Sequence, residues 1–312
     1  MSYIILYIVW GDCVKYIIDT DPGIDDAIAI IMAIKNHLNV IGFTLATGNV
    51  ERDKSENNLK IIEDFLETNI PIYKGEITNE SDLETAEYAH GISGLGYAVF
   101  PKNKTRRVEK MSAEDFIIKS SKKYKDDLTL VCLGPLTNLA NAIRKDKNLP
   151  KRIKKLVVMG ATYNPDSDKI YKEFNIKIDP KAAKIVFNSP FEEIRVITHE
   201  IGVKSFVEKD YIENLKNSRD IISRFVGVIA EKYVEFSYDH YGTIGLGTPD
   251  PTTIASIIDD SIIAYEPFKI DVIDDGADSG NSFAIPVKES NILLSIDFDI
   301  KKFRKLFKDT FK

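Results

Sequence analysis

The sequence predicts an α/β fold: a single domain built on a mostly parallel, doubly wound, Rossmann-like sheet. Short apolar runs rich in β-favouring residues alternate with helix-like segments from Val14 to about Asp274, as in repeated βαβ units. The apolar runs are nearly continuous, as expected for strands covered on both faces. Ligands of such sheets bind outside the carboxyl ends of the strands, so we expect the active site there.

The predicted elements follow one another in a regular order. Strands are predicted over residues 16–19, 40–46, 128–133, 156–159 and 194–198, and helices over 25–37, 54–67, 113–125 and 136–144. Ser112 and Asp115 precede and begin the third helix in the manner of a capping box. A hairpin over 268–272 and 282–287 and a basic C-terminal helix complete the chain.

Composition limits the partners and the compartment. The 312 residues, 44% of them hydrophobic, can bury a full core, and we expect one domain over 15–312 after an N-terminal extension, 1–14, of open status. A net charge of −6 and a pI near 5.4 argue against binding nucleic acid or an anionic membrane. No apolar run reaches membrane-spanning length, and the two cysteines form no disulfide framework, so a cytoplasmic protein is predicted. The absence of glutamine, with abundant lysine, glutamate and isoleucine, fits a thermophile.

A cluster of acidic residues follows the first predicted strand. Asp19, Asp21, Asp25 and Asp26 place four carboxylates within eight residues, around a tight Pro22-Gly23 turn. These carboxylates would repel one another strongly unless a cation lay among them, and a hard divalent ion is the natural choice. In a simpler interpretation, the last two aspartates only complement the dipole of the helix that follows.

Two known families open with aspartates at the end of a first strand. Phosphatases of the haloacid dehalogenase type require Thr or Val where this chain has Gly23. The segment 19–26 instead resembles the opening motif of the nucleoside hydrolases (inosine-uridine-type N-ribohydrolases), Asp-x-Asp-Pro-Gly-x-Asp-Asp, at every position. The resemblance continues in the family's order along nearly the whole chain after residue 14, through Thr47-Gly48-Asn49, His90-Gly91-Ile92-Ser93-Gly94-Leu95-Gly96, Gly134-Pro135-Leu136-Thr137-Asn138, Glu173-Phe174-Asn175-Ile176, Asp179-Pro180 and Asp250-Pro251.

This resemblance implies a calcium site and a general base. Asp21, Asp26 and Asp250 are the implied carboxylate ligands of Ca²⁺, together with the main-chain carbonyl of Leu133. Such an all-oxygen donor set suits calcium, which would also take the ribose 2′- and 3′-hydroxyls and one water. Asp21 would remove a proton from this water as it attacks the anomeric carbon, and Asp25 would hydrogen-bond the 2′-hydroxyl.

The ribose would be held by Asn49, Glu173 and Asn175, which match the family's sugar-binding positions. Asn49 could also be an ordinary turn residue, and Glu173 a solvated acid. The alternation of Phe174 and Ile176 with Glu173 and Asn175 indicates a strand-like segment. For Thr137-Asn138 a structural role, such as capping a helix, is favoured over ligand contact.

The nucleobase half of the site departs from the family pattern. Several members carry a histidine before the last metal aspartate, where this chain has Pro249, and the single tryptophan, Trp10, lies in the unmatched N-terminal extension. His90 matches a family histidine near the base, and it lies in the segment 76–110, which we expect to be an active-site loop that orders over substrate. The other candidates are Tyr233, Tyr238, His240 and Tyr241, although tyrosines at helical spacing are more often packing residues.

Four further residues lack clear motif support. His37 and His199 match no motif, and neither is assigned a role. Counting from the Met159-Gly160 turn places Ser167 where the family usually has an asparagine that helps hold the 5′ end of the ribose. Asn164 lies nearby in the sequence and could substitute for it.

The predicted function is calcium-dependent hydrolysis of the N-glycosidic bond of ribonucleosides to free base and ribose, in purine or pyrimidine salvage. The alternative is a nucleoside- or ribose-binding protein of the same fold that has lost turnover, because no leaving-group acid is evident. A ribonucleoside is the expected partner, and the resemblance implies a homodimer or homotetramer. Base preference stays open.

Overall fold

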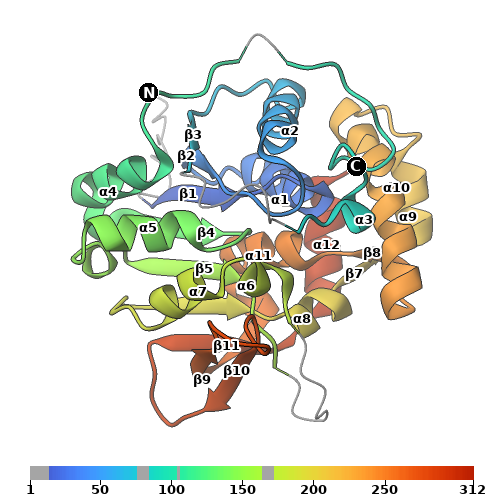
Figure 1. Ribbon diagram of the computed structural model, residues 1–312. Coiled ribbons are helices and arrows are strands. Elements are labelled where there is room, and N and C mark those ends of the chain that lie inside the picture. Colours follow the sequence, from blue (N-terminus) through green and yellow to red (C-terminus); the bar gives the residue numbers. More distant parts are fainter. Residues whose placement is uncertain (1–13, 76–83, 104–105, 164–171) are drawn as a thin grey trace, which may run out of the picture.

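A nine-stranded sheet forms the centre of the molecule, in the strand order β10-β9-β11-β6-β5-β4-β1-β2-β3 (Figure 1). The computed structural model describes residues 14–75, 84–103, 106–163 and 172–312. Neighbouring strands from β11 to β3 are parallel, whereas β9 pairs antiparallel with both β11 and β10. The strands of this sheet are β1 (Lys15–Thr20), β2 (Val40–Leu45), β3 (Ile72–Lys74), β4 (Leu128–Cys132), β5 (Lys155–Met159), β6 (Ile194–Ile197), β9 (Ile263–Val272), β10 (Ser282–Pro286) and β11 (Ile292–Phe298).

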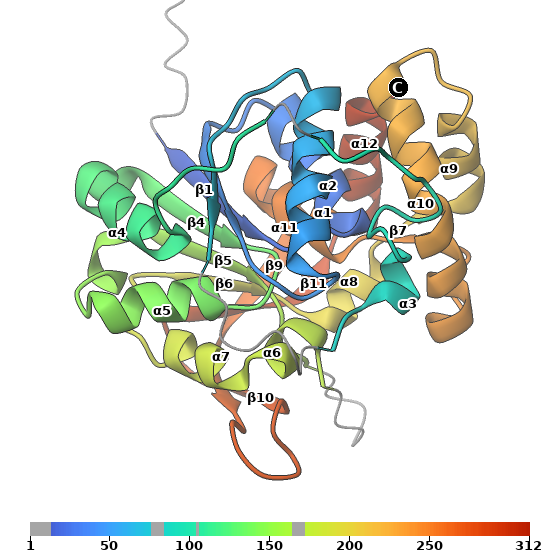
Figure 2. The ribbon, with the colours of Figure 1, turned by 45° about the horizontal axis from the view of Figure 1, so that its top comes forward.

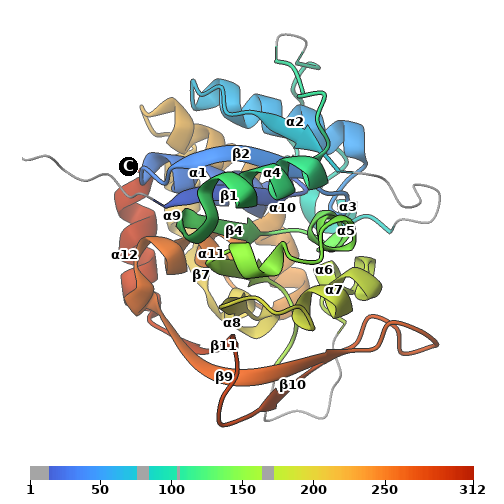
Figure 3. The same ribbon diagram turned by 90° about the vertical axis from the view of Figure 1, so that its left-hand side faces the viewer.

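Helices cover both faces of the sheet. One apolar core joins α1, α2, α10, α11 and α12 to one face, and a second core joins α4, α5 and α7 to the other, which is the side turned to the viewer in Figure 3. A small antiparallel pair, β7 (Phe206–Glu208) and β8 (Gly245–Gly247), lies beside α10. The helices are α1 (Ile24–Lys35), α2 (Arg52–Phe65), α3 (Glu87–His90), α4 (Ala113–Tyr124), α5 (Thr137–Lys145), α6 (Phe174–Ile178), α7 (Pro180–Phe187), α8 (His199–Lys204), α9 (Lys209–Leu215), α10 (Ile221–Tyr241), α11 (Pro249–Ile258) and α12 (Ile300–Thr310).

The predicted fold class is confirmed. The five predicted strands correspond to β1, β2, β4, β5 and β6, and the four predicted helices to α1, α2, α4 and α5, with ends that differ by one or two residues. Ser112 caps α4 as expected, because its hydroxyl accepts a hydrogen bond from the Asp115 N–H at 3.2 Å. The hairpin β9-β10 and the C-terminal helix α12 are also present.

Helix α1 is the central helix of the molecule, and every residue from Ile24 to Ala33 is buried. It begins directly after the Pro22-Gly23 turn at the end of β1. Helix α11 packs along α1, as Figure 2 also shows. This packing carries Asp250, in the first turn of α11, to the first turn of α1, where Asp25 and Asp26 lie.

None of the helices in the described part of the chain combines the length and the hydropathy that crossing a membrane would require. Several predictions fall outside the described residues. Trp10 and all but the last residue of the N-terminal extension belong to 1–13, and Asn164 and Ser167 belong to 164–171. Of the expected active-site loop, residues 76–83 and 104–105 are also outside, and the described part contains the short helix α3.

Candidate active site

The strand ends of β1, β2 and β4 meet at one edge of the sheet. Asp19, near the end of β1, is in register with Thr44 on one side and with Cys132 on the other. Its carboxylate accepts hydrogen bonds from the Thr44 hydroxyl and, at 2.7 Å, from the Asn138 side chain. Asn138 therefore has the structural role that was favoured for it, although it supports a strand end and does not cap its helix.

Three buried carboxylates lie together just beyond this edge. Asp25, Asp26 and Asp250 each offer an oxygen within 4.8 Å of the others, and all three are buried. The resemblance had implied Asp21 in place of Asp25 as a ligand. Asp21 lies beside the group, since its main-chain N–H donates to the Asp26 carboxylate at 3.3 Å. The structure thus brings the first-strand aspartates and the distant Asp250 to one place.

Asp26 is held by donors on each side. One of its oxygens accepts from the Thr20 hydroxyl at 2.6 Å, and the other from the Gly23 N–H at 3.0 Å and the Asn49 side chain at 2.8 Å. Hydrogen bonds of this kind favour the charged form of a carboxyl group. Asp26 is therefore oriented before any ligand arrives.

Asp21 is held on one side only. Its Oδ2 accepts from the Asn49 N–H at 2.7 Å, whereas its Oδ1 is buried and has no hydrogen-bond partner among the described residues. A Cβ built on Gly48 or on Gly134 would lie 2.2 Å from one of these two oxygens. Only glycine at both positions leaves room for the carboxylate.

The electrostatics of the cluster favour a bound cation. Burial, together with the neighbouring carboxylates, raises the pKa of Asp25 to about 8 and the pKa values of Asp21 and Asp250 well above the usual range. A cation among them would reverse this shift by stabilising the charged forms. Asp21 and Asp25 each keep one buried oxygen without a hydrogen-bond partner in the described chain, so oxygens suited to a hard metal ion remain available.

The part of the site that is predicted to bind ribose contains Glu173 and Asn175, which lie at the start of the short helix α6. Glu173 caps α6, and its carboxylate accepts from the N–H groups of Asn175 and Ile176 at 2.9 and 3.0 Å. The prediction of a strand-like segment here is wrong, because these capping bonds turn the chain into a helix. The Asn175 side chain donates to the Leu133 carbonyl at 2.7 Å, so the two predicted residues are in contact.

His90 reaches the site from α3. Its Nδ1 accepts a hydrogen bond from the Ile24 N–H at 3.0 Å, at the start of α1, and lies 3.7 Å from an oxygen of Asp25. Burial lowers the pKa of His90 to about 3. A neutral ring that accepts at Nδ1 carries its hydrogen on Nε2. His90 packs against Tyr233 of α10, with ring centroids 5.1 Å apart.

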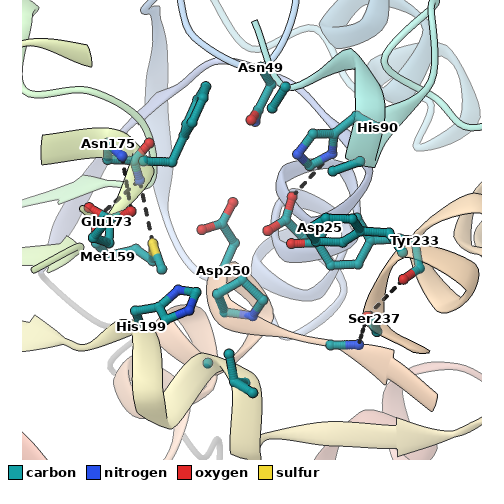
Figure 4. A pocket seen from close by; sticks show the side chains of 18 of the residues that line it. Asp25, Asn49, His90, Met159, Glu173, Asn175, His199, Tyr233, Ser237 and Asp250 are labelled. Carbon is teal, nitrogen blue, oxygen red and sulfur yellow. Dashed lines mark hydrogen bonds and ion pairs between the residues drawn. The ribbon is translucent and has the colours of Figure 1, made fainter. Parts of the chain in front are cut away.

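These groups line one cavity of about 170 Å³ (Figure 4). The predicted residues on its wall are Asp25, Asn49, His90, Leu133, Glu173, Asn175 and Asp250. Asp21 and Asp26 are fully buried and do not form part of the wall. Helix α10 supplies the aromatic part of the wall through Tyr233, Phe236 and Tyr241, and α8 supplies His199.

Comparison with known proteins identifies the family of the chain. Residues 16–305 match the family model described as inosine-uridine preferring nucleoside hydrolase. The chain belongs to this family. It is 34% identical to a probable uridine nucleosidase 2 of Arabidopsis thaliana, over 82% of this chain and 80% of that protein. It is 29% identical to an inosine-uridine preferring nucleoside hydrolase of Crithidia fasciculata, over 83% of each chain.

Solved structures of the family share the fold of this nucleoside hydrolase. A purine-preferring ribonucleoside hydrolase from Gardnerella vaginalis superposes with a TM-score of 0.86 at 28% identity. The plant nucleoside hydrolase PpNRh1 superposes with a TM-score of 0.84 at 27% identity. Each alignment covers 95% of this chain and 98% of the other. The protein is therefore a nucleoside N-ribohydrolase family enzyme with the nucleoside hydrolase fold.

The aromatic residues predicted for the base pocket of this nucleoside hydrolase separate into two groups. Tyr233 and Tyr241 line the cavity. Tyr238 is 60% exposed and, like His240, is not part of the cavity wall. Sequence spacing could not separate them, because all four candidates belong to a single helix end whose orientation depends on tertiary packing.

His199 is a cavity residue to which the motifs assigned no role. It is the first residue of α8 and follows β6 after one intervening residue. The rule that ligands bind beyond the carboxyl ends of strands could have found it, because β6 is a central parallel strand. His37, the other unassigned histidine, is exposed beyond the end of α1 and lies away from the cavity wall.

Proposed function

We propose that this nucleoside hydrolase binds Ca²⁺ and hydrolyses the N-glycosidic bond of ribonucleosides, releasing free base and ribose for salvage. The observation that carries the proposal is the buried group Asp25, Asp26 and Asp250, of which Asp25 and Asp250 line a cavity that also contains Glu173 and Asn175. Hard cations prefer such carboxylate oxygens. Sequence similarity to a probable uridine nucleosidase and to an inosine-uridine preferring nucleoside hydrolase supports the reaction class.

Four groups would hold the ion: the carboxylates of Asp21, Asp26 and Asp250 and the carbonyl of Leu133. The Oδ1 of Asp21, which has no hydrogen-bond partner among the described residues, supports its inclusion. When bound, the ion would lower the pKa of the attacking water. The membership of Asp25 in the carboxylate group makes it a further candidate, beside its proposed contact with the ribose 2′-hydroxyl.

Asp21 would act as the general base of the reaction. The Asn49 N–H and the close packing of Gly48 and Gly134 orient the Asp21 carboxylate. A base that is already fixed in place loses less entropy in the transition state. Asn49, Glu173 and Asn175 would bind the ribose hydroxyls. Because the bond breaks through a state that resembles an oxocarbenium ion, nearby carboxylates stabilise the transition state more than the substrate.

The nucleobase would lie against the aromatic side of the cavity. His90 presents an Nε2–H donor in its neutral form, and Tyr233 packs beside it. Such a donor can hydrogen-bond a carbonyl or a ring nitrogen of the base.

One experiment tests the proposal as a whole. Uridine, cytidine, inosine and adenosine are incubated with the protein after removal of metal by a chelator, with and without added Ca²⁺, and free base and reducing sugar are measured. We expect both products only with the ion, and loss of both in Asp21→Ala. Full activity of the stripped protein or of the variant would refute the mechanism. Tight nucleoside binding in calorimetry without any product would favour the binding protein instead.

A further inference from the structure

One histidine on the cavity wall has no role in the proposed function. His199 begins α8, and its N–H donates at 3.1 Å to the carbonyl of Ala161, which lies two residues beyond the end of β5. In the view of Figure 4, His199 lies across the cavity from His90, with Asp250 between them. The two histidines thus approach the same space from different elements.

The packing of α8 and one ring contact define the surroundings of His199. Helix α8 packs closely on α11, since a Cβ at Gly202 would lie 2.7 Å from the Cβ of Pro249. His199 precedes Gly202 by one helical turn, so it lies along the wall that Pro249 and Asp250 form. On its other side, Tyr241 of α10 meets the His199 ring edge to face, with centroids 5.5 Å apart.

Cleavage of the N-glycosidic bond leaves its electron pair on a nucleobase nitrogen, which needs a proton. Several groups on the wall are poorly suited to supply it. The Nδ1 of His90 already accepts the Ile24 N–H at 3.0 Å, so this nitrogen holds no proton and the ring is neutral. Burial raises the pKa of Tyr233 well above the usual range, which makes its hydroxyl a weak acid. The Pro249 side chain has no acidic proton to donate.

The two lysines on the wall are engaged elsewhere. Lys172 donates to the carbonyls of Ala277 and Ser279 at 3.2 and 2.8 Å. Lys177 forms an ion pair with Glu84 at 2.5 Å. Both ammonium groups therefore point to partners that do not line the cavity.

We propose that His199 donates the proton that the departing nucleobase requires, an assignment that rests on the proposed function. In this step the C1′–N bond breaks, its electron pair goes to nitrogen, and the nitrogen takes the proton of the protonated His199 ring. Water forms the new C1′–O bond and gives its proton to Asp21. Solvent then removes the proton from Asp21 and returns one to His199, so that nucleoside and water become base and ribose.

The surroundings of His199 suit a proton donor. Burial lowers its pKa, and the Glu200 carboxylate opposes this shift and so favours the protonated ring that the step requires. The Tyr163 N–H holds Glu200 at 2.8 Å. Tyr241 of α10 packs against the His199 ring, and Asp250 and Glu173 line the same cavity.

The test compares substrates whose leaving groups differ in their need for a proton. His199→Asn is assayed with uridine and inosine, and with 4-nitrophenyl β-ribofuranoside, whose phenolate leaves without protonation. We expect kcat/KM for the nucleosides to fall about 100-fold or more, while kcat/KM for the nitrophenyl riboside changes little. His37→Asn, at an exposed histidine, is the matched control and should behave as wild type.

The outcomes separate this inference from the proposed function. A wild-type protein that cleaves neither substrate class would contradict the proposed function. An active wild type whose His199→Asn variant loses both classes equally, or neither, would overturn the role of His199 alone. His199→Gln, which keeps a side chain of similar length, is assayed in parallel, and circular dichroism of both variants excludes general unfolding as the cause of a selective loss.

Discussion

The side chain of Asn49 donates to the carboxylate of Asp26 at 2.8 Å. The same amide group lies 3.2 Å from the main-chain oxygen of Asp21, and the Asn49 N–H donates to the Asp21 carboxylate. One residue in the loop after β2 therefore positions two aspartates that follow β1. The order of the metal half of the site depends on this link between neighbouring strands.

Asn49→Ala should weaken both the fold and the site. Removal of the amide leaves Asp26 with one donor fewer in a buried position, which costs about 1–3 kcal/mol. We expect a loss of this size in the free energy of unfolding, measured by urea denaturation, and a lower kcat/KM for nucleosides. Asn141→Ala, on the partly exposed side of α5, should change the unfolding free energy by less than about 0.5 kcal/mol. Equal stability of the two variants would contradict the role of Asn49.

Gly134→Ala should displace the proposed base. The added methyl group would lie 2.2 Å from Oδ1 of Asp21, so the carboxylate must move. Misplacement of a catalytic group by about 1 Å can cost about 100-fold in rate, and we expect a loss of this order in kcat with the fold retained. Gly276→Asn, at a positive φ of 77° in open space, is the control and should keep full activity. An active Gly134→Ala enzyme would argue against Asp21 as the base.

Asp250→Asn should separate metal binding from folding. The substitution removes one negative charge from three crowded buried carboxylates, so the metal-free protein should melt at the same or a higher temperature. Calorimetry should show much weaker Ca²⁺ binding, and the nucleoside assay a loss of turnover. Asp278→Asn, at an exposed aspartate of the β9-β10 hairpin, should leave all three measurements unchanged. Undiminished Ca²⁺ affinity in Asp250→Asn would exclude this carboxylate as a ligand.

Tyr265 should make the protein less stable in alkaline solution. Burial raises the pKa of Tyr265 from 10.0 to about 12, so between these values the folded protein binds more protons than the unfolded chain. Its stabilising contribution is complete below pH 10 and is lost as the pH rises to 12, by at most about 1.4 kcal/mol per pH unit. The slope should be smaller in Tyr265→Phe, which keeps the ring beneath Arg195. Tyr238→Phe should keep the wild-type slope, and identical slopes in all three proteins would disprove the assignment.

The sequence determined the fold class and the first-strand half of the site. The apolar runs that become β1, β2, β4, β5 and β6 are local features, and strands buried on both faces require them. The turn after β1 places Asp21, Asp25 and Asp26 close together for the same local reason. The conformation at Glu173 was missed, because four residues of alternating polarity fit a strand and a capped helix equally well, and the capping hydrogen bonds decide between them.

Tertiary structure alone decided which distant residues join the aspartates. The packing of α11 on α1 brings Asp250 to Asp25 and Asp26, and the packing of α8 on α11 brings His199 to the same wall. The orientation of α10 selects Tyr233 and Tyr241 for the cavity and leaves Tyr238 in solvent. The spacing of residues along a chain determines which side chains share one helix or strand, whereas contacts between elements depend on how their buried faces fit together.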